Sequence, residues 1–364
     1  MKTNSNPLKI LFFDAAFPPP IKGGKEKQAH LLAAALKRQG LDVCALSYEH
    51  NGNQTQLHEA VQVFRVKKSL MAPLLFFMRL FRLRVEYKIL HIHTPSRIGH
   101  LMAFMGFILG YRVVLKFPGQ YLLDDLSPLA RCYWGITIRL AKLLVVLEEK
   151  TQNTLISSWK VDKNKIFMAS NGVEVLTKKK YIPEKTIKLL FVGRLVKGKG
   201  CSVLIDACEK LEDKKMDWQA DIVGEGPLMD SLQMMTKEME LAMKINFHGY
   251  QSDVLKYMMD ADLLILPSRS EGMSNVLLEA MAIGLPIICT DVGASKQLLG
   301  KQGEKYLIKP FDVNGLSNKI TLFAEDKILL KEYGTYLYER CKAKYSIQAI
   351  ADSYIERYQK LEEH

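Results

Sequence analysis

Residues 263–282 carry the sequence Leu263-Leu-Ile-Leu-Pro-Ser-Arg-Ser-Glu271-Gly-Met-Ser-Asn-Val-Leu-Leu-Glu279-Ala-Met-Ala. Its apolar start ends at Leu266 and is typical of a buried strand, and the polar loop that follows contains Glu271. Ser274 or Asn275 can cap a helix that holds Glu279. The stretch therefore predicts a strand, a loop and a helix, which is the repeating unit of a parallel α/β sheet.

The same alternation extends outward from this stretch in both directions. Two similar runs open the two halves of the chain, Lys9-Ile-Leu-Phe-Phe-Asp14 and Lys188-Leu-Leu-Phe-Val-Gly193, and a helical pattern follows each of them. Further apolar runs are Val43–Ser47, Ile89–His93, Val113–Phe117, Leu143–Leu147, Ile166–Ala169, Ala220–Val223, Ile245–His248, Ile287–Thr290 and Tyr306–Ile308. Strands separated by helices form right-handed units of a parallel sheet. The sequence therefore predicts two doubly wound, Rossmann-like α/β domains that face a cleft, where such sheets bind their ligands.

Length and composition exclude several classes of protein. The 364 residues suffice for two domains with cores of their own, and 48% hydrophobic and 25% charged residues are typical of globular proteins. The longest apolar stretches, near residues 70–81 and 98–111, are shorter than the ~18–20 residues that cross a bilayer. The brief apolar run near the start does not fit a signal peptide, and the six scattered cysteines fit reduced thiols. We therefore expect a cytoplasmic protein without an integral membrane segment.

Positive charge is concentrated in the first half of the chain. Residues 1–180 contain 27 Lys and Arg against 12 Asp and Glu, whereas the remainder contains 24 against 27. Leu70–Val85 contains three Arg and no acidic residue, and it predicts an amphipathic basic helix that could lie on an anionic membrane. The alternative is an ordinary core-facing helix before the strand at Ile89. No known nucleic-acid-binding module is present, so nucleic acid is not an expected partner.

The loops of the second half favour a phosphate ligand. The start of the helix at Ser274 offers backbone N–H groups to an anion, and Arg194 and Lys199 can neutralise a diphosphate. Glu279 and Glu271 can accept hydrogen bonds from sugar hydroxyls, although either carboxylate alone is more readily an ordinary surface residue.

Two partial motifs in this half are similar to nucleotide-binding or metal-binding motifs of other protein classes. Gly193-x4-Gly198-Lys199 departs from a Walker A loop because Gly200 replaces the Ser or Thr that binds magnesium. Asp260-Ala-Asp262 leads into a buried strand, and its carboxylates are expected to be structural. No metal site is expected.

The stretch from Glu271 to Glu279 closely resembles the Glu-x7-Glu motif of glycosyltransferase family 4, the retaining enzymes of the GT-B fold. Other segments resemble that family in order and spacing: Gly193-Arg194-Leu195, Lys199-Gly200, Val223-Gly224-Glu225-Gly226-Pro227, Phe247-His-Gly249, Ala261-Asp262 with Pro267-Ser268, and Asp291-Val-Gly293. Together they cover nearly all of residues 188–293. This combination is far more specific than any one of its parts.

The resemblance implies an organisation and an activity. Residues 1–177 would bind the acceptor, residues 178–345 would bind a sugar nucleotide, and the helix at 346–364 would pack back on the first domain. The polar stretch Thr177–Thr186 is the expected linker. The activity implied is that of a retaining, metal-independent hexosyltransferase with a nucleotide-diphosphate sugar as donor and no cofactor. The usual acceptor is a glycan or lipid-linked glycan of bacterial surface polysaccharide or lipopolysaccharide, reached from the inner face of the cell membrane.

The resemblance also assigns roles to particular residues. Arg194, Lys199 and Glu271 would act in catalysis. The donor would be bound by Gly23, Gly24, Gly193, Gly224, Glu225, Met273, Ser274, Asn275 and Glu279. His93, at the end of a predicted strand, is a further candidate for the cleft.

Two departures from the family pattern leave alternatives open. Many relatives have a His after the strand that ends at Phe117, and this chain has Pro118-Gly119 there. Gln297 stands where the family usually has Glu. A catalytically silent partner subunit of the same fold and a sugar-nucleotide epimerase of the GT-B fold are the alternative functions. A phosphorylase lacks the Glu-x7-Glu string in this form.

Overall fold

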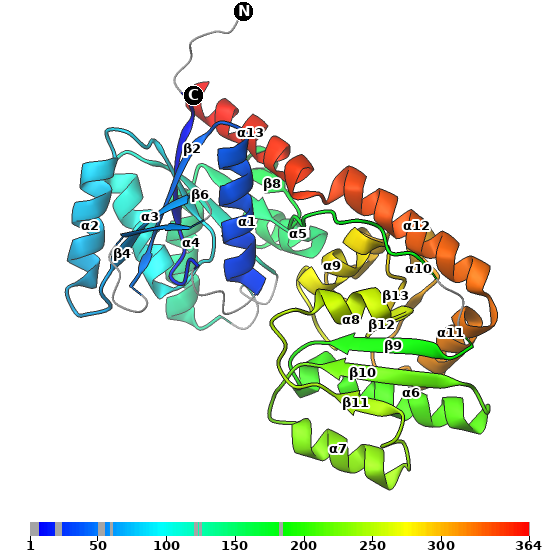
Figure 1. The fold of residues 1–364 in the computed structure, drawn as a ribbon. Helices are drawn as coiled ribbons and strands as arrows, with labels where there is room; N and C mark the ends of the chain where they lie inside the picture. The colour runs from blue at the N-terminus through cyan, green and yellow to red at the C-terminus, as the bar shows by residue number, and fades with distance from the viewer. Residues whose placement is uncertain are drawn as a thin grey trace, which may run out of the picture. The chain divides into compact units, whose positions relative to one another are not determined.

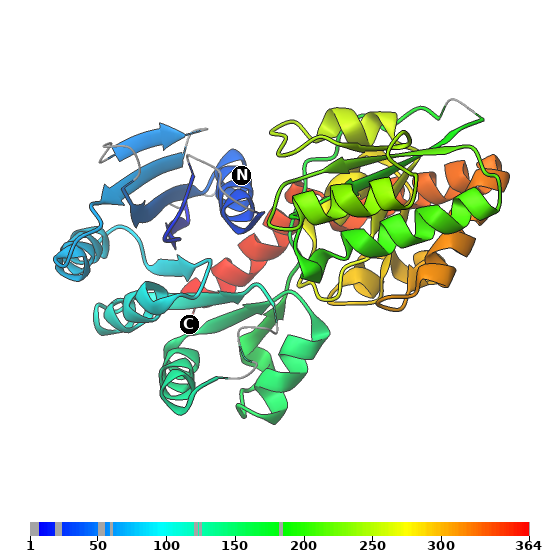
Figure 2. The same ribbon diagram turned by 90° about the horizontal axis from the view of Figure 1, so that it is seen from below.

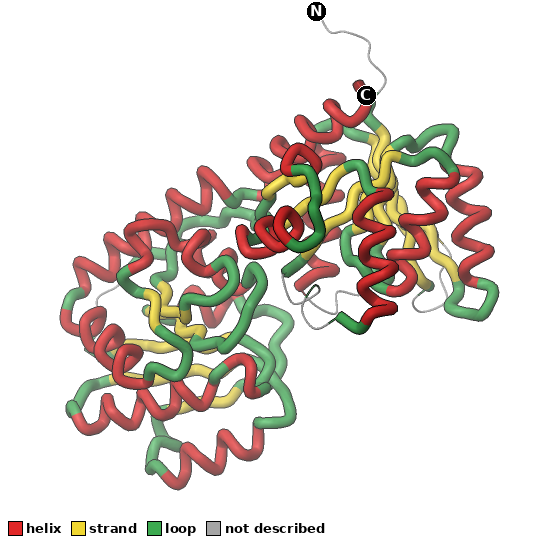
Figure 3. Tube along the Cα trace, turned by 180° about the vertical axis from the view of Figure 1, so that it is seen from behind, coloured by secondary structure: helices red, strands yellow, loops and turns green. Residues whose placement is uncertain are grey.

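The computed structural model describes residues 7–18, 24–49, 55–58, 61–119, 123, 126–181 and 185–363, with only the backbone for residues 55–58. The chain divides into two compact units, Met1–Gly172 with Ile347–His364, and Val173–Ser346. Each unit contains one sheet with helices on both of its faces (Figure 3). The predicted pair of doubly wound Rossmann-like domains is confirmed.

The sheet of the first unit has eight strands in the order β3-β4-β2-β1-β5-β6-β7-β8. Their bounds are β1 Lys9–Phe13, β2 Asp42–Tyr48, β3 Thr55–His58, β4 Val61–Val66, β5 Ile89–Ile92, β6 Arg112–Phe117, β7 Leu143–Val146 and β8 Ile166–Met168. All neighbours pair in parallel except β3, which pairs antiparallel with β4. The inner strands β5 and β7 are buried along their whole length, as expected for parallel strands covered on both faces.

Helices from both ends of the chain cover one face of this sheet. They are α1 Gly24–Arg38 and α13 Ile347–Glu363, while α2 Ala72–Leu83, α3 Arg97–Ile108, α4 Pro128–Leu140 and α5 Glu149–Ser157 cover the other face (Figures 1 and 2). The buried side chains of α13 recur at helical spacing and include Ile347, Tyr354 and Tyr358. Tyr358 Oη lies 2.5 Å from His91 Nδ1 on β5. The last helix is therefore part of the core of the first unit.

The sheet of the second unit has six parallel strands in the order β11-β10-β9-β12-β13-β14. Their bounds are β9 Ile187–Val192, β10 Trp218–Val223, β11 Ile245–Phe247, β12 Leu263–Leu266, β13 Ile287–Thr290 and β14 Leu307–Ile308. The helices are α6 Cys201–Asp213, α7 Met229–Glu238, α8 Leu255–Asp260, α9 Asn275–Ile283, α10 Ser295–Glu304, α11 Val313–Glu325 and α12 Lys327–Lys344. Among them, α6 packs on α11 and α9 packs on α12. This order places the ends of β10, β9, β12 and β13 side by side.

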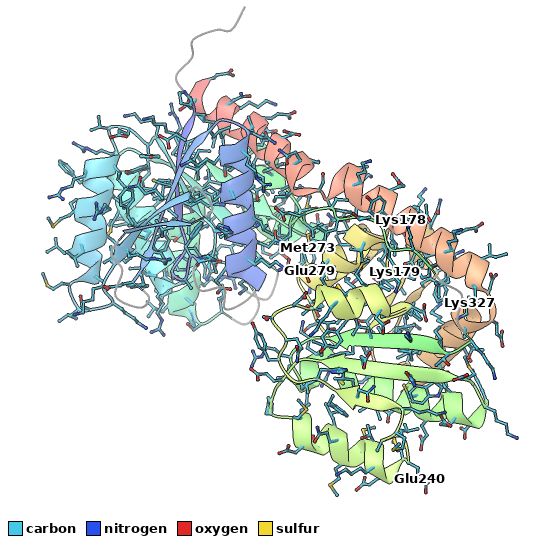
Figure 4. The ribbon with its side chains drawn as sticks, viewed as in Figure 1. Lys178, Lys179, Glu240, Met273, Glu279 and Lys327 are labelled. Atoms are coloured by element: carbon cyan, nitrogen blue, oxygen red, sulfur yellow. The ribbon has the colours of Figure 1, made fainter. Side chains whose placement is uncertain are left out.

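The second unit begins at Val173 rather than at the expected residue 178, because backbone hydrogen bonds attach the residues before 178 to it. Val173 N donates to Tyr345 O at 2.9 Å, and Leu176 N donates to Ala282 O at 3.3 Å. In the stretch expected as a linker, Lys179 is 6% exposed, and its ammonium donates to Ala261 O. Lys178 Nζ donates to Thr335 Oγ1 on α12 at 2.7 Å, and both lysines are labelled in Figure 4.

Candidate functional site

The loops after four neighbouring strands of the second unit are joined to one another through their backbones. Leu195 N, after β9, donates to Glu225 O, after β10, at 2.9 Å. Arg269 N, after β12, donates to Gly198 O at 2.8 Å, and Ala294 N, after β13, donates to Gly272 O at 2.9 Å. The carboxyl ends of parallel strands are where α/β sheets bind ligands. These loops therefore form the candidate site.

Two glycines let these loops approach more closely than a side chain would permit. Gly200 has a φ of +70°, and a Cβ on it would stand 2.0 Å from Pro267 O. Gly224 has a φ of +143°, and a Cβ on it would stand 1.9 Å from Gly193 O. Both conformations are ones that glycine adopts at little cost. Gly193 and Gly224, which the sequence singled out, thus lie in direct backbone contact.

Lys199 and Glu271 form an ion pair within the site. Lys199 Nζ lies 2.6 Å from Glu271 Oε1, and their side chains are 30% and 11% exposed. The hydroxyl of buried Ser268 donates to the same oxygen at 2.7 Å, and Ser268 O accepts from Thr290 Oγ1 at 2.5 Å. Hydrogen bonds to charged groups are about twice as strong as neutral ones. The carboxylate of Glu271 is therefore held in one orientation.

Helix α9 starts beside this pair. Ser274 occupies the capping position with extended backbone, and its side chain makes no capping hydrogen bond in the described structure. The first turn therefore presents N–H groups and the positive end of the helix dipole to a ligand. Asn275 is the first helical residue, and Met273 and Glu279, both labelled in Figure 4, belong to this loop and helix. Met273 and Ser274 are buried, whereas Glu279 is partly exposed.

Arg194 and Glu225 lie on adjoining loops of the same site. Both side chains are exposed, and the bond from Leu195 N to Glu225 O joins their backbones. The structure therefore brings together Arg194, Lys199, Glu225 and Glu271, with the start of α9 on the loop after β12. Ser268 belongs to one of the segments that resemble the family, but the sequence assigned it no role in the site, although a Ser three residues before a candidate carboxylate is a usable signal.

The remaining candidates belong to the first unit. Gly23 lies outside the described residues, and Gly24 is the exposed first residue of α1. His93 follows β5 and is 3% exposed, with its ring stacked 5.7 Å from that of His91. Burial and the charge of Lys116 hold the pKa of His93 well below its ordinary value, so the ring is neutral near pH 7.

Lys116 belongs to a buried polar cluster that the sequence did not reveal. It lies on β6 just before Phe117, is 3% exposed, and donates to Asn171 Oδ1 at 3.1 Å. Burial lowers the pKa of Lys116 to about 7, and the nearby charge of Asp14 opposes that shift. Burial also raises the pKa of Asp14. The only local signal for the cluster was a lysine inside an apolar run, because Asn171 is distant in sequence.

We expect Lys116→Met to flatten the pH dependence of stability. Lys116 keeps its ordinary pKa of 10.5 in the unfolded chain, whereas the folded chain releases the proton above about pH 7. The unfolded state then binds more protons, so stability rises with pH above that value. Between pH 6 and 8.5 the unfolding free energy should rise by about 2 kcal/mol more in the wild type than in the variant. Urea unfolding at both pH values measures this difference. An equal change of the unfolding free energy in the wild type and the variant would contradict the prediction.

Three further features bear on the chemistry of the chain. Asp262 Oδ2 accepts from Lys188 N at 2.9 Å and Asp260 Oδ1 lies 3.3 Å from Lys188 Nζ, so both carboxylates attach the start of β12 to β9. The described residues include no group of three or more His, Cys, Asp or Glu side chains suited to a metal ion, nor a helix that is long and apolar enough to cross a membrane. All six cysteines are free, and only Cys132 among them is exposed.

The architecture is that of the GT-B glycosyltransferases. The crystal structure of Anabaena Alr3699/HepE in complex with UDP superimposes with a TM-score of 0.82, at 18% identity, over 97% of this chain and 100% of that one. At this identity the likeness concerns the fold alone.

Both halves of the sequence match glycosyltransferase families. Residues 22–175 match Glycosyltransferase Family 4, and residues 173–340 match Glycosyl transferases group 1. The chain therefore belongs to glycosyltransferase family 4, group 1. TuaC of Bacillus subtilis (strain 168), a glycosyltransferase assigned to teichuronic acid biosynthesis, is 35% identical over 186 residues, which span 51% of this chain but 45% of TuaC. The UDP-Gal:alpha-D-GlcNAc-diphosphoundecaprenol alpha-1,3-galactosyltransferase of Escherichia coli is 24% identical over 90% of this chain and 91% of that protein.

Proposed function

We propose that the protein transfers a hexose from a nucleotide-diphosphate sugar to a glycan or lipid-linked glycan acceptor, with retention of configuration and without a metal or cofactor. The observation that carries the proposal is the ion pair of Lys199 with Glu271, anchored by Ser268 and adjoining the start of α9. This part of the site combines a cation, an oriented carboxylate and a helix N-terminus. The cation and the helix N-terminus suit a diphosphate, and the carboxylate suits the hydroxyls of a sugar bonded to it.

Each part of the site has a role in this proposal. Lys199 and Arg194 bind the diphosphate, Lys199 as a point charge and Arg194 as a planar fork. The backbone from Met273 to Asn275 adds N–H groups at the helix start. Glu271 accepts from hydroxyls of the donor sugar, and Glu279 accepts from the ribose. Gly193, Gly224 and Glu225 line the nucleotide, Gly23 and Gly24 contribute to binding the donor, and His93 is the further candidate for the cleft.

The chemistry that this site supports is stabilisation of the leaving group. The bond from the anomeric carbon to the diphosphate oxygen breaks, and its electron pair remains on the diphosphate. The acceptor hydroxyl bonds to the same face of the sugar, and its proton passes to the departing diphosphate. Lys199 and Arg194 act where negative charge grows, which is the most effective place for fixed cations. The proposal thus needs no enzyme nucleophile.

The acceptor and location are proposed from relatives and charge. The Escherichia coli relative is named for a diphosphoundecaprenol-linked sugar, and TuaC is assigned to teichuronic acid biosynthesis. We propose a similar bacterial surface-polysaccharide acceptor, used in the cytoplasm at the inner face of the membrane. The basic segment Leu70–Val85 is the proposed point of contact with the lipid.

A thermal-shift panel of UDP-, GDP- and other sugar nucleotides tests the donor assignment. At about 100 times its Kd, a donor stabilises the native state by about 2.7 kcal/mol, which raises Tm by roughly 5–10 °C for a unit of this size. We expect one nucleotide class to do so without added metal. No shift with any donor would contradict the proposal. Binding without transfer to any acceptor would favour a silent subunit, and an altered donor sugar without acceptor would favour an epimerase.

A further inference from the structure

Helix α2 exposes apolar side chains on the side opposite its core stripe. Its buried residues, Ala72, Phe76 and Leu80, recur at helical spacing and face the sheet. The outer side carries Leu74, Met78 and Phe81, which are 49%, 44% and 48% exposed. An ordinary surface helix presents polar residues there. Core packing therefore accounts for only one side of this helix.

The two helices that follow repeat this arrangement. Phe107 on α3 is 51% exposed, and Leu129 and Ile136 on α4 are 68% and 47% exposed. Helix α2 packs against α3, and α3 packs against α4, all on the same face of the sheet. We call the exposed side chains of Leu74, Met78, Phe81, Phe107, Leu129 and Ile136 the three-helix face. Extended apolar surfaces of this kind mark interaction sites.

The charges on these helices all have one sign. Their sequences contain no Asp or Glu, and their charged residues are Arg79, Arg82, Arg97, Arg131 and Arg139. At the end of α2, Arg84 lies 4.1 Å from the ring centre of Phe81. Beside it, a pocket of about 390 Å³ is lined by residues that include Arg84 and Lys88. Cations beside an apolar surface complement a layer of anionic headgroups over hydrocarbon.

We propose that the three-helix face lies on an anionic lipid bilayer, with its apolar side chains among the acyl chains and its arginines at the phosphates. A second copy of this chain is a poorer partner, because a symmetric contact would bring the same cations together. The inference deepens the proposed function, on which it rests for a lipid-linked acceptor. It enlarges the contact from one basic helix to three.

Vesicle sedimentation in the absence of donor tests the proposal. The full chain is mixed with vesicles of phosphatidylglycerol and phosphatidylcholine, or of phosphatidylcholine alone, at about 0.1 M and 1 M salt. We expect binding to the anionic vesicles at low salt and weaker binding at high salt, where the screening length falls from about 10 Å to 3 Å. Absence of binding to anionic vesicles at low salt would overturn the proposal.

Matched variants separate this face from the rest of the surface. The triple variant Phe81→Ser, Phe107→Ser and Ile136→Ser should weaken vesicle binding at least about tenfold, since it removes inserted apolar area. The control triple Met234→Ser, Met243→Ser and Ile328→Ser changes side chains that are 61%, 92% and 73% exposed on the second unit. It should leave binding unchanged. Equal binding by the two triples would overturn the assignment.

Two further measurements identify the cause of a negative result. Light scattering tests for a dimer. If the unmodified protein forms a dimer that only the first triple variant dissociates, and if it does not bind vesicles, the face contacts a second copy and the proposal is overturned. The donor thermal shift depends on the second unit and should be the same in both triples. A donor shift without vesicle binding would reject this inference alone, whereas vesicle binding without any donor shift would reject only the proposed function.

Discussion

Lys199→Ala and Glu271→Ala are each expected to lower turnover by about 100- to 1,000-fold, the usual effect of removing one group that stabilises a charged transition state. Lys199→Ala removes a proposed diphosphate cation and also one of two donors to Glu271 Oε1. Glu271→Ala removes the oriented acceptor for the donor sugar and leaves Lys199 without this partner. Initial rates with the donor identified by thermal shift measure the loss.

The control for this prediction lies on the same short helical turn. Lys197 and Lys199 both belong to the 3-10 helix Lys197–Lys199, but Lys197 is exposed and Lys199 is the one that contacts Glu271. Lys197→Ala should keep nearly full activity. Unchanged far-UV circular dichroism and Tm would show that each variant is folded. Full activity in both Lys199→Ala and Glu271→Ala would end the assignment.

Gly200→Ala is expected to destabilise the second unit by more than about 3 kcal/mol, from backbone strain at positive φ together with the steric clash. The new methyl group would stand 2.0 Å from Pro267 O, a backbone atom that cannot turn aside. Because that atom belongs to the loop after β12, the shift would also move Glu271 away from Lys199. Urea unfolding measures the loss of stability, and the donor thermal shift measures the loss of the site.

Gly198 provides the matched control two residues away. A Cβ on Gly198 would meet no atom within 4 Å, and its φ is not in the positive range. Gly198→Ala should therefore change stability by less than about 1 kcal/mol. If Gly200→Ala proves as stable as Gly198→Ala, the close approach of the two loops is not what requires glycine here.

Much of the fold could be predicted because parallel strands leave a strong local signal. Runs such as Leu263–Leu266 are buried on both faces, so they are apolar at every position. The strand β4, Val61–Val66, was not predicted, because its first residues alternate between buried and exposed positions, next to the edge strand β3. Its partner β3 is antiparallel to it, a pairing that strand and helix alternation does not indicate.

The candidate site likewise contains one contact that could be predicted from the sequence and others that could not. Lys199 and Glu271 are 72 residues apart, and their meeting follows from the order of strands, since β9 and β12 are neighbours. The contribution of Ser268 depends on the course of one loop and has no periodic signal. The pair of Lys116 and Asn171 depends on the packing of the first unit around β6. Such buried polar contacts are set by three-dimensional packing, which local sequence patterns do not encode.

Because α13 supplies Tyr354 and Tyr358 to the core of the first unit, that core cannot close until the ribosome has made α13. The second unit, Val173–Ser346, is continuous in sequence and can fold while α13 is still being translated. At about 5–20 residues per second, the first unit stays incomplete for roughly ten to forty seconds after its residue 172 is added. The half of the protein that is synthesised first is therefore the half that finishes folding last.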